Sequence, residues 1–167
     1  FSYRNPLESS LVLAQGQCIT LRNLVSDKLP HCSLMTLSAC ESGLTDIADI
    51  TDAFVGLPGG LLIAGAKAVV SSLWLVKDLA TALLMIKFYE YLINSKSSPQ
   101  SVSIALNQAQ QWLRKATTAD LIKWSGALPL EPELKLELRG KLRGCYHLND
   151  IPFANPYYWA AFCAIGQ

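Results

Sequence analysis

The segment Ser33–Gly43, SLMTLSACESG, decides the fold that we predict for this chain. Its first part, Ser33–Ala39, is a compact and mostly apolar run, which is typical of a central strand buried on both faces. Cys40 follows directly, and the chain then turns polar and reaches Gly43. We therefore expect Cys40 to lie at the carboxyl end of a strand, where solvent and substrate can reach it.

The segments on either side of this run predict alternating strands and helices. Apolar periodicity and turn residues indicate a hairpin from Ser10–Ala14 and Cys18–Leu21, followed by a short helix capped by Thr20. A helix from Thr51 or Asp52 to Ala64, which stops at Gly65, and a strand at Lys67–Leu75 come next. Two more helices are expected at Asp78–Ile93 and Pro99–Lys115, and the apolar face of the first consists of Leu79, Leu83, Ile86, Tyr89 and Leu92. The order strand, helix, strand, helix predicts a parallel sheet.

Two later segments complete the expected fold. Glu131–Gly144 alternates charge at helical spacing, and we interpret it as a solvated surface helix or hairpin arm without chemistry of its own. Pro156–Gly166 is aromatic and apolar, which predicts a last strand against the edge of the sheet. The predicted fold class is α/β, with a mostly parallel central sheet flanked by helices.

Composition favours one globular domain. The chain has 167 residues, and 51% of them are hydrophobic, which is enough for one sizeable core and too little length for two comfortable domains. A net charge of +1 offers no footprint for binding nucleic acid or an anionic membrane. The most apolar stretch, Ala53–Val76, is broken by Pro58 and several glycines, so we predict no transmembrane helix.

The cysteine pattern points to a reducing compartment. The five cysteines form no CxxC pair and follow no secretory leader, which argues against disulfides and zinc and predicts a cytoplasmic protein. None of the common motifs for dinucleotides, nucleoside triphosphates, catalytic zinc or a serine nucleophile occurs, so we expect no metal and no cofactor.

Two segments deliver polar groups to the carboxyl ends of the predicted strands. They are Cys40–Gly43 and Leu75–Asp78, and a parallel sheet would bring them to one crevice. A catalytic thiol there needs a base, and the chain has only two histidines. His31 precedes the strand that leads to Cys40, so we place it at the far end of that strand. His147 lies in a late loop, where it is exposed or pairs with Asp150, and a catalytic role for it stays open.

Two other roles for Cys40 stay open on the residues alone. Cysteine is among the most buried residue types, so Cys40 could be a core thiol. It could also be an exposed redox-sensing thiol, although no resolving cysteine lies nearby in the sequence.

Four segments in this order resemble one family. They are NPLESSLVLA at 5–14, LSACESG at 37–43, GLLIAGAKAVVSSLW at 60–74 and PYYWAAF at 156–162. Together they resemble the CHAT domain, a caspase-like cysteine peptidase domain that often follows tetratricopeptide repeats and is related more distantly to separases and caspases. The resemblance extends over nearly the whole chain and implies a three-layer α/β/α fold.

The resemblance implies specific roles for this chain. Residues 1–167 would be the C-terminal part of a CHAT domain, with Cys40 as the nucleophile that attacks a peptide carbonyl and the backbone amide of Cys40 in the oxyanion hole. The family's partner histidine stands in a His-Gly motif, which by this alignment falls immediately before Phe1. The sequence begins with Phe1 and not with methionine, so we expect a fragment of a longer polypeptide. Because this fragment would lack the histidine, we expect it to be inactive by itself.

The expected substrate pocket is defined by three residues. In several relatives the residue two before the nucleophile lines the primary pocket, and here that residue is the neutral Ser38. Asp78 is the best candidate for an acidic pocket wall, beside Trp74 at the end of the preceding strand, although Asp78 could equally cap the next helix. Lys77 stands where the family often has a second acid, which weakens the case for basic substrates.

Two functions follow as alternatives. The first is a cysteine endopeptidase that cleaves a protein partner after a signal from a repeat region upstream in the same chain. The second is a non-catalytic caspase-like module for interaction or scaffolding, which the missing histidine and the apolar surface of Ile151–Tyr158 would suit. Codons for His-Gly before Phe1 would decide between them.

Overall fold

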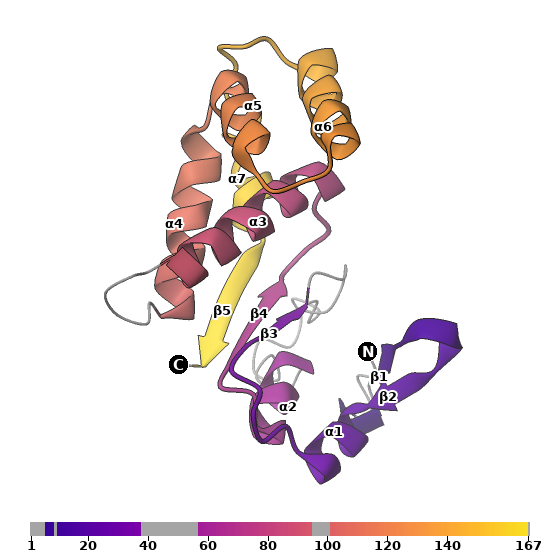
Figure 1. Cartoon of the computed structure of the whole chain (residues 1–167). Helices are drawn as coiled ribbons and strands as arrows, with labels where there is room; N and C mark the ends of the chain where they lie inside the picture. Colours follow the sequence, from indigo (N-terminus) through magenta and orange to yellow (C-terminus); the bar gives the residue numbers. More distant parts are fainter. Residues whose placement is uncertain (1–5, 9, 38–56, 95–100, 167) are drawn as a thin grey trace.

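A computed structural model describes residues 6–8, 10–37, 57–94 and 101–166. Within these ranges the chain is mixed α/β, with seven α-helices and two small sheets (Figure 1). The strands are β1 (Ser10–Val12), β2 (Cys18–Thr20), β3 (Met35–Leu37), β4 (Ala68–Ser72) and β5 (Phe162–Gly166). The helices are α1 (Leu21–Asp27), α2 (Leu57–Ala64), α3 (Asp78–Asn94), α4 (Val102–Lys115), α5 (Thr118–Ala127), α6 (Pro132–Cys145) and α7 (Pro156–Trp159).

The larger sheet has β4 in the middle of the order β3-β4-β5. β3 runs parallel to β4, with Leu37 opposite Ser71, which confirms the parallel pairing predicted for these two strands. β5 runs antiparallel to β4, with Phe162 opposite Ser72. The described sheet therefore has one parallel and one antiparallel pair, where the sequence predicts a mostly parallel sheet.

Both faces of this sheet are covered. Successive residues of a strand point to opposite faces, and the neighbours Val69 and Val70 accordingly belong to two different buried clusters. Val69 shares its cluster with residues of α1 and α2, including Leu61, and Val70 shares its cluster with residues of α3 and α4, including Leu84. All residues of β4 are buried, as expected for a strand with helices on both sides.

The amino-terminal hairpin and α1 form as predicted. β1 and β2 pair antiparallel, and the turn between them places Gln15 and Gly16 in the left-handed region, with φ of 63° and 73°. Thr20 then caps α1, because its hydroxyl accepts a hydrogen bond from the Asn23 N–H while the Asn23 side chain accepts from the Thr20 N–H.

Helix α2 contains the Pro-Gly-Gly sequence that made its prediction awkward. Pro58 is the second residue of the helix, where no intrahelical partner for its N–H is lost. Gly60 faces α1 so closely that a Cβ would lie 2.3 Å from the Leu21 side chain. Gly65 ends the helix at a φ of +115°, as predicted. The residues predicted to begin this helix, 51–56, lie outside the described residues.

Helices α3 and α4 form where the sequence predicts helices, but the buried face of α3 differs from the predicted one. In α3 the buried residues are Ala80, Leu83, Leu84, Lys87 and Phe88, so the predicted face of Leu79, Leu83, Ile86, Tyr89 and Leu92 is rotated from the real one. Tyr89 is exposed, and its hydroxyl hydrogen-bonds the Thr36 hydroxyl at 2.7 Å. The helix is apolar on most of its circumference, so spacing alone does not select the buried stripe.

The structure differs from the predictions in two places, the carboxyl-terminal run Pro156–Gly166 and the segment after α4. Pro156–Trp159 is a short helix begun by the Asn155 side chain, and only Phe162–Gly166 is a strand, so the last predicted strand is half as long as expected. Helix α5, capped by Thr117, falls in a segment for which the sequence predicted no element. Helix α6 confirms the helix alternative for Glu131–Gly144.

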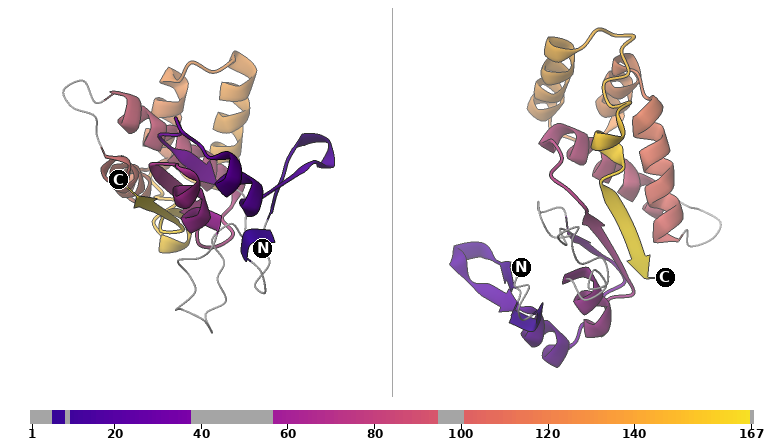
Figure 2. Two further views of the ribbon diagram at one scale, coloured as in Figure 1. Left: turned by 90° about the horizontal axis from the view of Figure 1, so that it is seen from below. Right: turned by 180° about the vertical axis from the view of Figure 1, so that it is seen from behind.

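The described molecule is elongated. Figure 2 shows the β1–β2 hairpin and α1 at one end and the α5–α6 pair at the other, with the β3-β4-β5 sheet between them. None of the helices in the described ranges combines the length and apolar character that crossing a membrane would need.

Candidate functional site

The parallel pairing of β3 and β4 makes both strands end at the same edge of the sheet. Leu37, the last residue of β3, lies opposite Ser71, and β4 ends one residue later at Ser72. The chain after β4 crosses this edge from residue 73 to 77 and enters α3 at Asp78. In open α/β sheets, ligands bind outside the carboxyl ends of the strands, so this edge is the candidate site.

Trp74 is firmly attached at this edge. Its indole Nε1–H donates to the backbone oxygen of Tyr157 at 3.0 Å, and the ring packs against the cluster of α3 and α4. One residue earlier, the Leu73 N–H donates to the oxygen of Ala161 at 2.7 Å. These two bonds tie the end of β4 to α7 and to the start of β5, so the segment after β4 has a fixed position.

Asp78 is exposed at the first position of α3. Its carboxylate lies close enough to α6 to help raise the pKa of Lys141, although the larger causes are the hydrogen bond and charge of Glu137. A carboxylate near a helix amino terminus is also favoured by the helix dipole. Both the structural role as a first-turn acid and the proposed role as a pocket acid are therefore compatible with its position.

Exposed apolar side chains surround Trp74. Leu73, Leu75 and Tyr157 are 41%, 52% and 44% exposed. Tyr157 belongs to the run Ile151–Tyr158 that the sequence singled out as apolar surface, and Ile151 is exposed as well. An edge of this kind can hold an apolar side chain of a bound peptide or partner.

Neither histidine lies on the two segments that leave this edge. His31 is exposed in the turn before β3, at the opposite end of that strand from the candidate site, as predicted. His147 is exposed in the loop after α6, and Asp150 accepts a hydrogen bond from its backbone N–H at 2.8 Å. The interaction with Asp150 thus exists, but it uses the backbone and not the imidazole.

The predicted nucleophile Cys40 and the pocket residue Ser38 lie outside the described residues. The four other cysteines are free thiols: Cys18, Cys32, Cys145 and Cys163. Cys163 lies within β5, and its Sγ is 3.7 Å from the Ser71 hydroxyl.

The family comparison agrees with the resemblance seen in the sequence. The family model for the CHAT domain matches residues 1–167, which is the whole sequence. The chain belongs to the CHAT domain family. Among curated proteins, none matches the chain.

This CHAT domain also has a cluster that the sequence did not reveal. Lys87, on the buried face of α3, lies within 5.0 Å of the ring centres of Tyr91 and Trp112 and 5.4 Å from that of Trp124. Its ammonium pairs with Glu90 at 3.2 Å. The only sequence signal was a lysine inside an apolar helix. Tyr91 lies on the same helix, and the two tryptophans come from α4 and α5.

The described part of this CHAT domain contains no group of three metal-ligating side chains.

Proposed function

We propose that this CHAT domain is the carboxyl-terminal part of a caspase-like cysteine endopeptidase in which Cys40 is the nucleophile. The observation that carries the proposal is the parallel pairing of β3 with β4, because it brings the exit of the strand before Cys40 to the same edge as Trp74 and Asp78. Cys40 follows Leu37 by three residues, and three residues of chain span at most about 11 Å.

The proposed chemistry is acyl transfer. The Cys40 thiolate attacks the carbonyl carbon of a peptide bond, its backbone N–H stabilises the oxyanion, and the amine leaves with a proton from the conjugate acid of the base. Water then hydrolyses the thioester and restores the thiol. The base would be the family's histidine, supplied by residues upstream of Phe1, because His31 and His147 stand on other segments.

The proposed pocket combines Ser38, Trp74 and Asp78. Support comes from Trp74, which the bond to Tyr157 holds at the edge, and from the exposure of Asp78 on the segment that follows β4. The helices on both faces of the described sheet support a caspase-like three-layer fold. A protein substrate, a repeat region upstream in the same chain and a cytoplasmic location remain parts of the proposal.

The pH dependence of alkylation tests whether Cys40 is activated. The polypeptide is extended upstream through the expected His-Gly motif, and the Cys40→Ala variant provides the background from the other cysteines. A thiolate that titrates well below the ordinary value of about 8.5 supports an assembled cysteine–histidine pair. A Cys40 that reacts no faster than the exposed Cys18 across the pH range contradicts the proposal.

Cleavage of a partner protein gives the second test. Cys40→Ala should abolish cleavage, since removing the nucleophile of such a pair lowers the rate by several orders of magnitude, about 10⁴-fold or more. The matched control is Cys18→Ala, which removes an exposed thiol from the β1–β2 hairpin and should leave the rate unchanged. Cleavage that survives Cys40→Ala would assign the nucleophile elsewhere.

The second candidate is a non-catalytic interaction module. It is favoured by the two histidines, neither of which lies on the segments that leave the candidate edge, and by the exposed apolar side chains of Leu73, Leu75 and Tyr157. Sequencing the coding region upstream of Phe1 separates the candidates, because a His-Gly motif there favours the peptidase and its absence favours the module.

A further inference from the structure

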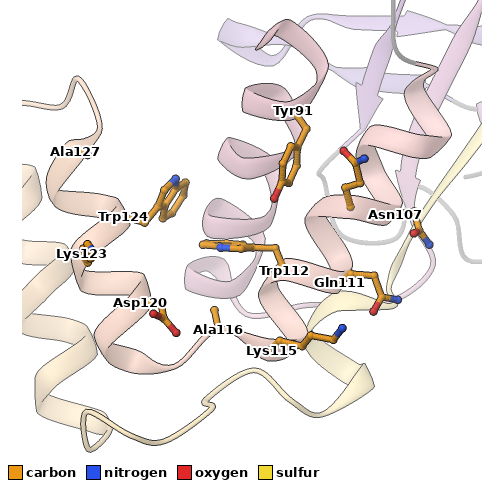
Figure 3. A pocket seen from close by; sticks show the side chains of 11 residues that line it. Tyr91, Asn107, Gln111, Trp112, Lys115, Ala116, Asp120, Lys123, Trp124 and Ala127 are labelled. Atoms are coloured by element: carbon orange, nitrogen blue, oxygen red, sulfur yellow. The ribbon is translucent and has the colours of Figure 1, made fainter. Parts of the chain in front are cut away.

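An open groove lies on the side of the molecule formed by α3, α4 and α5. Its volume is about 880 Å³, which is within the range of ligand-binding pockets. Figure 3 shows its wall and rim: aromatic side chains from the three helices face one another, and a row of polar side chains follows α4. The groove shares no residue with the edge that carries Trp74 and Asp78.

The aromatic wall is held rigidly from behind. Trp112 and Trp124 contact each other edge to face, with ring centres 4.6 Å apart. Lys87 lies beside both rings and beside Tyr91, and the Trp124 Nε1–H donates to Glu90 at 2.7 Å. Burial, and then the charge of Glu90, raises the pKa of Tyr91 above its ordinary 10.0. A preformed wall of this kind lowers the entropy cost of binding.

The polar rim has a spacing that suits an extended peptide. Asn107, Gln111 and Lys115 occupy every fourth position of α4, so their side chains recur about every 6 Å along one face. An extended chain repeats every two residues, or about 6.7 Å. Side-chain amides carry both donors and acceptors, as peptide units do. Two amides in this row can therefore bond alternate peptide units of one extended segment.

The charges of the groove favour an acidic ligand. Lys115 and Lys123 face it with Asp120 as the acid among its lining residues. Asp120 accepts hydrogen bonds from the Thr117 hydroxyl and N–H, which cap α5 and lower the Asp120 pKa. The carboxylate is thus engaged mainly with Thr117, and the charge of Lys123 acts on it more weakly. Both ammonium groups are exposed and can pair with a ligand.

We propose that this groove binds an extended, acidic segment of a partner protein. The amides of Asn107 and Gln111 bond its backbone, an apolar side chain packs on Trp112 and Tyr91, and an acidic side chain pairs with Lys115 or Lys123. A nucleic acid is the alternative occupant, since its bases could stack on the same rings. A net charge of +1 for the whole chain gives no strong attraction for a polyanion and favours the peptide.

A selection experiment tests the ligand chemistry. Octapeptides of random sequence, displayed on phage, are selected against the chain and, in parallel, against K115E/K123E. We expect the wild type to enrich peptides with Asp or Glu next to apolar residues, and the variant to lose them. Enrichment of no peptide, of peptides without acidic residues, or of the same peptides by the variant would overturn the proposal.

Tryptophan indole signals in NMR spectra then locate the bound peptide. The chain has four tryptophans, of which Trp112 and Trp124 line the groove while Trp74 and Trp159 do not. Titration with the enriched peptide should shift the signals of the first pair and leave the second pair in place. Shifts confined to Trp74 or Trp159 would place the ligand elsewhere and contradict the proposal.

Affinity measurements complete the test with a matched control. Lys115→Glu should lower the affinity for the enriched peptide about tenfold or more, because the new carboxylate repels the acidic side chain that the lysine attracts. Arg139→Glu makes the same reversal at an exposed position of α6, outside the groove, and should change the affinity little. Equal losses in both variants, or binding of oligoadenylate in the groove in place of peptide, would reject the acidic peptide as the occupant.

Discussion

At the residue scale, Thr117 and Asp120 together cap the amino terminus of α5. The Thr117 hydroxyl donates to the Asp120 carboxylate at 2.6 Å and accepts from the Asp120 N–H at 3.2 Å. A Thr followed three residues later by an acid is a recognisable helix start. We nevertheless predict no helix here from the sequence, because α5 has only ten residues and contains Gly126, which weakens a helix.

The same pair gives a prediction about pH. The hydrogen bond from the Thr117 hydroxyl, then that from its N–H, lowers the Asp120 pKa below its ordinary 3.8. Folding therefore favours the ionised carboxylate, so this contribution to stability is present above pH 3.8 and is lost as the pH falls through the lowered pKa. Thr117→Val should raise the Asp120 pKa toward 3.8, as measured by NMR titration of its carboxyl carbon.

Glu137 is the internal control for that titration. Its pKa is also lowered, but by the hydrogen bond and charge of Lys141 on α6, so it should titrate identically in the wild type and in Thr117→Val. An Asp120 pKa that does not move when the hydroxyl is removed would show that the hydrogen bond from the Thr117 N–H and the charge of Lys123 control it instead.

At the element scale, Glu90 connects α3 to α5. It accepts from the Trp124 indole at 2.7 Å and pairs with Lys87 at 3.2 Å. Trp124→Phe keeps an aromatic ring but removes the donor, and we expect it to lower the free energy of unfolding by about 1–2 kcal/mol in urea denaturation. The Glu90 side chain is 35% exposed, so water compensates part of the loss.

A double-mutant cycle separates this bond from the change in ring size. Glu90→Ala and Trp124→Phe each remove one partner of the bond, and they should show a coupling energy of about 0.5–1.5 kcal/mol because the two side chains are in direct contact. If the two single effects simply add, the ring packing of Trp124 on Trp112 accounts for the loss, and Glu90 does not hold the two helices together.

The elements differ in how well their sequences predict them. Helix α4 carries its small and apolar residues at regular spacing. That spacing predicts a face of Val102, Ala105, Leu106, Ala109 and Leu113, and all of these except the half-buried Val102 are buried. Helix α3 has apolar residues on nearly every side, so its buried stripe depends on what packs against it. The split of Pro156–Gly166 into α7 and β5 likewise depends on pairing with β4, which local propensity does not encode.

At the scale of the whole molecule, the sequence could place the candidate edge but not its surroundings. The order of strands and helices predicts that β3 and β4 are parallel and end together, and the structure has this pairing. The bond from Trp74 to Tyr157 and the groove between α3, α4 and α5 join residues far apart in the chain. Contacts of this kind arise only from packing, so periodicity gives no sign of them.

The two buried clusters share β4, and this leads to a prediction about cooperativity. Leu61 lies fully buried with α1 and α2, and Leu84 lies fully buried with α3 and α4. Leu61→Ala and Leu84→Ala should each lower the free energy of unfolding by about 2–5 kcal/mol. Because β4 contributes Val69 to one cluster and Val70 to the other, loss of either should unfold the whole molecule in one transition.

Tryptophan fluorescence makes this prediction decisive, because all four tryptophans pack against the α3–α4 cluster. Leu61→Ala changes only the opposite face, yet in a cooperative molecule it should lower the urea midpoint seen by fluorescence as much as that seen by circular dichroism. An unchanged fluorescence midpoint, with an earlier first step in circular dichroism, would show that the α1–α2 side unfolds separately. The candidate edge, where β3 and β4 end, would then be assembled from two units of unequal stability.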